Sequence, residues 1–90
     1  MPNVVLPTTL TDLFPDAPRR VSVEGATVLE VLDRLDEKFP GMRSRICEPQ
    51  AGGARIRRHL LIFVDDERSD LTGAVGASSE VRVVPALSGG

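Results

Sequence analysis

Aromatic side chains are scarce in this sequence: among 90 residues there are three phenylalanines, and tryptophan and tyrosine are absent. Proteins that bind single-stranded nucleic acid usually stack the bases on aromatic rings. Eleven basic residues against thirteen acidic ones give a formal net charge of -2, without the basic excess of a general nucleic-acid binder. We therefore interpret the basic run "RIRRH" at 55–59 as a solvated edge that meets an acidic partner, and we expect that the protein does not bind nucleic acid.

Cysteine and histidine each occur once, as Cys47 and His59. A single thiol cannot form an internal disulfide, and no second cysteine stands at metal-ligand spacing. His59 has no evident serine or cysteine partner for a catalytic dyad. The carboxylates of "DDE" at 65–67 are typical of a solvated turn rather than of a metal site. The sequence thus predicts no metal, no bound cofactor and no enzyme active site.

Long apolar runs are also missing, since no stretch approaches the roughly 20 apolar residues of a membrane span. The start, "MPNVVLPTTL", has neither the basic region nor the apolar run of a signal peptide. A chain of this length buries only a little over ~60% of its unfolded surface, which leaves little room for an internal active site. We expect one domain, residues 1–90, that is cytoplasmic, contacts no membrane and is monomeric when free.

The clearest element in the sequence is a helix over residues 27–39. Thr27 and Glu30 have the spacing of a capping box, and Pro40-Gly41 provides a stop signal. Apolar residues recur at helical spacing between these signals, at Val28, Val31, Leu32, Leu35 and Phe39.

Strands are predicted on both sides of this helix. "NVVLP" and "RRVSVE", joined by a turn at "TDLFPDAP", indicate an N-terminal hairpin. "HLLIFV" gives the strongest strand signal, and "EVRVVPAL" predicts the last strand. Between them we expect a short helical turn at "MRSRICEP" with Met42 and Ile46 inward, a flexible loop at "QAGGARIRR", and a loop-rich "SDLTGAVGASS" with Leu71 and Val75 inward.

This element order predicts an α+β domain with one main helix packed on one face of a mixed sheet of four to five strands. The first and last strands would lie side by side in the middle of the sheet and project the C-terminus from it.

The order of these elements, followed by Gly89-Gly90, resembles the β-grasp, ubiquitin-like sulfur carriers of the ThiS and MoaD family. The matching pieces are "VVLPTTL", "GATVLEVLDRLDEKFPG", "FVDDE" and "VRVVPALSGG". The long "RSRICEPQAGGARIRRHLLIFVDDE" region looks most like the CysO-type carriers, which are paired with cysteine synthases.

The resemblance implies that the carboxylate of Gly90 is the working group. An E1-like enzyme would use ATP to convert it to an acyl-adenylate, and sulfur would then replace AMP to leave a thiocarboxylate. The resemblance further implies that the thiocarboxylate donates its sulfide to a PLP-dependent cysteine synthase and that a peptidase releases the adduct. The carrier itself would bind no cofactor.

The same resemblance assigns residues 86–90 to a flexible tail recognised by these enzymes. Gly89 and Gly90 lack Cβ atoms, so they fit a narrow channel and adopt angles closed to other residues. Leu87 and Ser88 are predicted to position the tail in that channel, and Pro85 restricts the backbone where it leaves the sheet.

Strand alternation also predicts a docking surface on the sheet face away from the helix. If Leu60, Ile62 and Val64 face the helix, their strand neighbours face outward. The predicted apolar patch consists of Val5, Leu61, Phe63 and Val84, and it is flanked by His59 and Arg82, which we also expect to contact a partner.

Other functions remain open from the sequence. One is a MoaD-like small subunit of molybdopterin synthase, and another is a carrier for thiamine or for a sulfur-containing natural product. A different class is a ubiquitin-like modifier joined to lysines through Gly90. The last is a plain interaction module in which the two glycines have no role.

Overall fold

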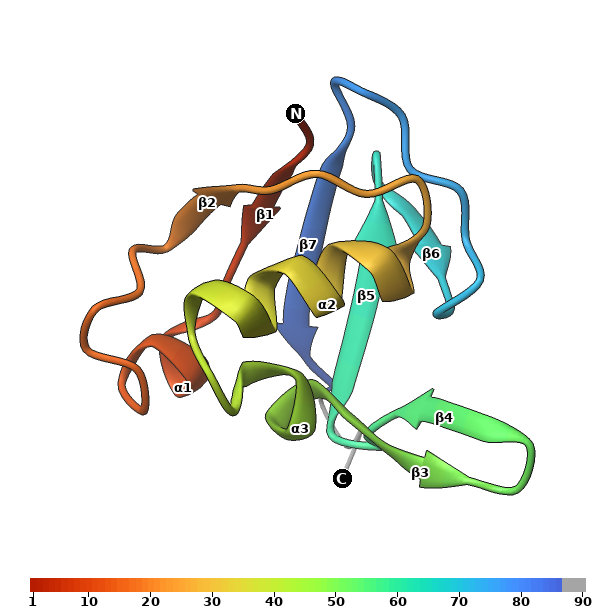
Figure 1. The fold of residues 1–90 in the computed structure, drawn as a ribbon, viewed down its shortest axis with the longest axis horizontal. Helices are drawn as coiled ribbons and strands as arrows, with labels where there is room; N and C mark the ends of the chain where they lie inside the picture. The colour runs from red at the N-terminus through yellow and green to blue at the C-terminus, as the bar shows by residue number, and fades with distance from the viewer. Residues whose placement is uncertain (87–90) are drawn as a thin grey trace.

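The computed structural model of the protein describes residues 1–86 (Figure 1). Five strands form a mixed sheet in the order β2-β1-β7-β5-β6, and β3 pairs with β4 in a separate two-stranded sheet. The longest helix, α2, lies across one face of the large sheet, as Figure 1 shows. The elements are β1 Asn3–Val5, α1 Thr8–Thr11, β2 Arg20–Ser22, α2 Val28–Lys38, α3 Met42–Ile46, β3 Cys47–Gln50, β4 Gly53–Ile56, β5 Leu60–Val64, β6 Glu67–Ser69 and β7 Glu80–Pro85.

The start of α2 is the predicted capping box with one shift in partner. The Thr27 hydroxyl accepts a hydrogen bond from the Glu30 amide at 3.2 Å. The Glu30 carboxylate reaches back to the amide of Ala26, at 3.1 Å, one residue before the cap. The first bond satisfies one of the amides that a helix start leaves without partners, and the second ties the residue before the cap to the first turn. The buried face of α2 comprises Val28, Val31, Leu32 and Leu35.

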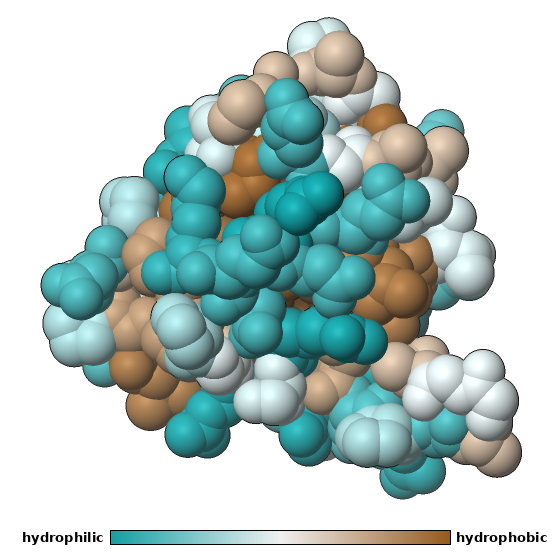
Figure 2. Space-filling model, viewed as in Figure 1, coloured by the Kyte–Doolittle hydropathy of each residue, from teal (hydrophilic) through white to brown (hydrophobic). Residues whose placement is uncertain are grey.

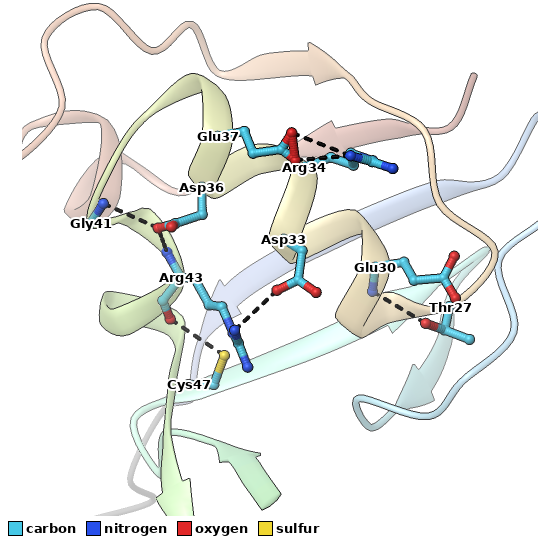
Figure 3. A network of polar contacts seen from close by, with 9 residues as sticks. All are labelled: Thr27, Glu30, Asp33, Arg34, Asp36, Glu37, Gly41, Arg43 and Cys47. Carbon is cyan, nitrogen blue, oxygen red and sulfur yellow. Dashed lines mark hydrogen bonds and ion pairs between the residues drawn. The ribbon is translucent and has the colours of Figure 1, made fainter.

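The end of α2 depends on Gly41, whose φ of 99° lies in the left-handed region that glycine adopts without strain. The Asp36 carboxylate accepts hydrogen bonds from the amides of Gly41 and Arg43, at 3.1 and 3.0 Å. Arg43 also forms an ion pair with Asp33 at 3.1 Å (Figure 3). These contacts fix the turn into α3, where Met42 and Ile46 are fully buried as predicted.

The last strand occupies the centre of the sheet. β7 runs parallel to β1 on one side and antiparallel to β5 on the other. The side chains of these three strands that face α2 are buried at 0 to 4% exposure: Val4, Leu60, Ile62, Val81 and Val83. The predicted β-grasp architecture is confirmed, with the N-terminal hairpin of β1 and β2 and with Leu71 and Val75 buried.

Three local predictions were wrong or incomplete. Residues 50–58 were expected to be a flexible loop, but Gln50 pairs with Gly53 and the segment forms the β3–β4 hairpin. Its cross-strand contacts include ion pairs from Arg55 and Arg57 to Glu48, at 2.9 and 3.4 Å, and its residues lack the apolar alternation that marks a strand. Two short elements, α1 before the predicted turn and β6 after β5, were also missed.

No helix within residues 1–86 is long and apolar enough to cross a membrane.

The tight turn between β5 and β6 is formed by Asp65 and Asp66, whose φ angles of 49° and 71° are both positive. Such a pair is typical of a type I′ hairpin turn, in which aspartate and asparagine are tolerated. The Asp65 carboxylate accepts hydrogen bonds from the Glu80 amide at 3.0 Å and the Ser79 hydroxyl at 2.8 Å. The turn therefore holds the start of the central strand β7 in place.

These two hydrogen bonds lower the pKa of Asp65, with the backbone bond from Glu80 as the larger cause. A carboxyl whose pKa is lower in the folded state stabilises the fold above its unfolded pKa, and this contribution is lost as the pH falls through the folded value. We expect Asp65→Asn to be less stable than the wild type near neutral pH and to lose less stability on acidification. Urea unfolding at about pH 7 and about pH 3 measures this difference.

Asp66→Asn, at the neighbouring position of the same turn, is the matched control because asparagine tolerates the same positive φ. If both variants lose stability equally with falling pH, Asp65 has no special part in the acid response.

Candidate functional site

The sheet face opposite α2 carries a row of residues that crosses all five strands. Strand pairing aligns the row directly, because each member is the register partner of the next. Since the intervening residues of the central strands are buried under α2, alternation places this row on the open face. From β2 to β6 the row is Arg20, Val5, Arg82, Phe63 and Arg68.

Next to this row, Leu61 on β5 pairs with Val84 on β7. Leu61, Phe63 and Val84 are partly exposed, as a docking surface requires. Val5 differs from the expectation: it lies on the predicted face but is only 7% exposed. Its register partners Arg20 and Arg82 flank it on both sides, so it offers a partner little surface. The accessible apolar part of the patch is formed by the other three residues.

Charge on this face is arranged around Glu80. Its carboxylate forms ion pairs with Arg20 at 3.1 Å and Arg82 at 2.9 Å. The hydrogen bond from Arg82 is the main cause that lowers the pKa of Glu80, so this side chain is a carboxylate at neutral pH. One carboxylate faces two guanidinium groups here, and Arg68 adds a third at the β6 edge. The open face therefore combines an apolar centre with a net positive border.

The predicted tail begins beside this patch. The last pair of the β5–β7 ladder joins Leu60 and Pro85, and the Ala86 amide then donates a hydrogen bond to the His59 carbonyl at 2.8 Å. The remaining predicted tail residues, Leu87, Ser88, Gly89 and Gly90, lie outside the described residues. Their predicted roles in recognition and sulfur transfer stay predictions. The path of β7 nevertheless fixes where the tail starts, at the end of the sheet to which the β7 arrow points in Figure 1.

Cys47 is placed where a reactive thiol is not favoured. It is the first residue of β3, is 5% exposed and donates a hydrogen bond from Sγ to the Arg43 carbonyl at 3.3 Å (Figure 3). Burial is the main cause that raises the pKa of this thiol, which keeps it protonated and weakly nucleophilic at neutral pH. Among residues 1–86, no group of three or more histidine, cysteine, aspartate or glutamate side chains is arranged to hold a metal ion.

We compared the chain with protein families, with individual proteins and with solved structures. A scan against protein-family models found no match. The sulfur carrier protein CysO of Mycobacterium tuberculosis is 29% identical over 76 residues, covering 80% of this chain and 81% of that protein. The chain resembles the CysO-type sulfur carriers.

The resemblance to CysO extends to the fold. CysO in the crystal structure of the Amycolatopsis orientalis BexX/CysO complex matches with a TM-score of 0.85 and 26% identity, over 100% of both chains. SAMP1 from Haloferax volcanii matches with a TM-score of 0.72 and 29% identity, over 99% of this chain and 98% of that one. Because these matches cover nearly the whole chain, the predicted resemblance to ubiquitin-like sulfur carriers is confirmed.

Sequence reasoning found the apolar centre of the open face and Arg82 beside it, but it missed Arg20 and Arg68, which lie on short strands. Arg20 belongs to a strand that was predicted, and its alternation with Val21 gave a usable signal for its orientation. Arg68 lies on β6, which carries no apolar alternation, so only the structure places it on this face.

Phe63→Asp tests the open face as a docking surface. The ring is only partly buried, so its loss should change the melting temperature little. We expect it to weaken binding of an activating enzyme by at least about tenfold, equivalent to about 1.4 kcal/mol. Titration calorimetry measures the binding, and Phe63→Leu, which keeps an apolar side chain, should bind nearly as the wild type does. A large fall in melting temperature for Phe63→Asp would instead identify Phe63 as a core residue.

Cys47→Ala tests whether the thiol takes part in sulfur loading. Because the side chain is small and buried, the substitution should cost about 1 kcal/mol of stability. It should leave sulfur loading of the chain unchanged, as measured by intact mass. A folded Cys47→Ala protein that no longer acquires sulfur would show that the thiol takes part in loading.

Proposed function

We propose that this protein is a sulfur carrier that is loaded at Gly90. The observation that supports the proposal best is its similarity to CysO, over 80% of the chain in sequence and over the whole chain in fold. The central position of β7 agrees with this role, since the tail then follows a strand held on both sides. Within this proposal the domain acts as a co-substrate that other enzymes recognise, and not as an enzyme itself.

The loading chemistry needs activation because a carboxylate is a poor electrophile. An E1-like enzyme transfers AMP from ATP to the Gly90 carboxylate and releases pyrophosphate. Sulfide then attacks the acyl carbon, the bond to AMP breaks, and a thiocarboxylate remains. Gly89 and Gly90 suit this reaction because neither carries a side chain that would obstruct a narrow channel. Leu87 and Ser88 position them in that channel.

The acceptor that fits the resemblance is a PLP-dependent cysteine synthase. The PLP belongs to that enzyme, where it supplies the electrophilic acceptor for the sulfide. This assignment is supported by the CysO name of the curated relatives. A peptidase would complete the cycle by releasing the product from Gly90.

A second candidate function is protein modification, and the similarity to SAMP1, a small archaeal modifier protein, favours it. In that case the activated Gly90 would be transferred to lysine amines. Digested cell extracts would then carry Gly-Gly remnants on lysines of other proteins. A MoaD-like role predicts instead a stable complex with a larger catalytic subunit, which a pull-down would capture.

Intact mass of the protein is the decisive measurement for sulfur loading. After incubation with ATP, a sulfide source and the E1-like enzyme of the same organism, we expect one oxygen to be replaced by one sulfur at Gly90. The gain should be absent from a chain that lacks Gly90. Gly89→Ala and Gly90→Ala should reduce loading strongly while the melting temperature stays unchanged, because residues 89 and 90 lie beyond the last strand.

An unmodified wild-type chain after incubation with a competent enzyme would count against the carrier function. Loading that survives truncation after Ser88 would show that the two glycines have no role.

A further inference from the structure

A groove of about 620 Å³ lies beside the start of the tail, separate from the apolar patch of the open sheet face. It is formed where α1, α3, the start of β5 and the end of β7 meet (Figure 1). Pro85 and Ala86, the last residues before the predicted recognition segment, form part of its wall. Leu13, Arg45, Arg57 and His59 also line the groove.

The groove is cationic, because no aspartate or glutamate is among its lining residues. Arg57 is held in position by hydrogen bonds to the Ser44 carbonyl at 2.8 Å and to Glu48 at 3.4 Å. Arg45 and His59 are exposed, and among residues 1–86 Arg45 has no ion pair within 4 Å. Glu48 partly neutralises Arg57, so Arg45 supplies the positive charge of the groove that the described part of the protein leaves without a carboxylate.

The groove also has an apolar side. Leu13 is 50% exposed and is one of two large apolar side chains that are exposed among residues 1–86. It lies in the turn after α1, where its side chain is not needed for the core. An apolar side chain next to guanidinium groups suits a partner segment that carries carboxylates beside an apolar residue.

The tail is short, and this limits how far Gly90 can lie from the groove. Gly90 is four residues beyond Ala86, and four extended residues span at most about 14 Å. An enzyme that holds Gly90 in its active site must therefore press against this end of the domain. We propose that the groove receives an acidic segment of the activating enzyme, with carboxylates facing Arg45 and Arg57 and an apolar side chain against Leu13. This inference rests on the proposed carrier function.

Charge reversal of Arg45 tests the proposal in the full-length protein. We expect Arg45→Glu to weaken binding of the E1-like enzyme by about tenfold and to reduce the salt dependence of binding. Leu13→Ser should weaken it several-fold without changing the melting temperature, because the side chain is half exposed. The matched control is Arg34→Glu on the outer surface of α2, whose side chain is 60% exposed, and it should bind as the wild type does. Titration calorimetry at two salt concentrations gives these constants.

Equal binding of wild type, Arg45→Glu and Leu13→Ser would overturn the proposal. Tighter binding of Arg45→Glu would also overturn it and would indicate that the groove holds the protein's own acidic C-terminus. Failure of the carrier function can be distinguished from failure of the groove proposal. A wild type that binds the enzyme but gains no sulfur counts against loading and not against the groove as a contact site. The binding constants of the variants then still decide whether the groove is a contact site.

Discussion

The central placement of β7 is the constraint on which the rest of the structure depends. This strand pairs in parallel with β1 and in antiparallel fashion with β5, while its inward valines pack beneath α2. The turn at Asp65 fixes its first residue, and the Ala86 hydrogen bond to His59 continues the pairing past its end. The position of Ala86, at which the predicted tail begins, follows from this pairing.

The two layers of the domain carry different charge. The outer surface of α2 is hydrophilic, as Figure 2 shows, and its acidic residues Glu30, Asp33, Asp36 and Glu37 outnumber its basic residues Arg34 and Lys38. The open sheet face and the groove at its end carry arginines that outnumber the neighbouring carboxylates. A net charge of -2 conceals this asymmetry. It would orient an approaching acidic enzyme toward the end of the domain from which the tail starts.

Sequence reasoning predicted the elements whose signals are local and apolar. The capping box at Thr27, the helical spacing of α2 and the alternation of β5 and β7 were sufficient for the helix, the central strands and the side of the sheet that is buried. The β3–β4 hairpin was missed because its strands, "CEPQ" and "GARI", lack apolar alternation, and the ion pairs of Glu48 join residues several positions apart. The groove beside the start of the tail could not be predicted from the sequence, because its lining residues Leu13, Arg45 and His59 come from three separate segments.

The parallel pairing of β1 with β7 joins the two ends of the chain, so it can form only after β7 has been synthesised. Asn3 finds its partner Glu80 only after almost the whole chain has been synthesised. Contacts of such long range form late, so the sheet cannot close while the last strand is still inside the ribosome. We expect a chain that ends before β7, and so lacks its central strand, to stay unfolded. Proteolysis of unfolded chains would then remove such products.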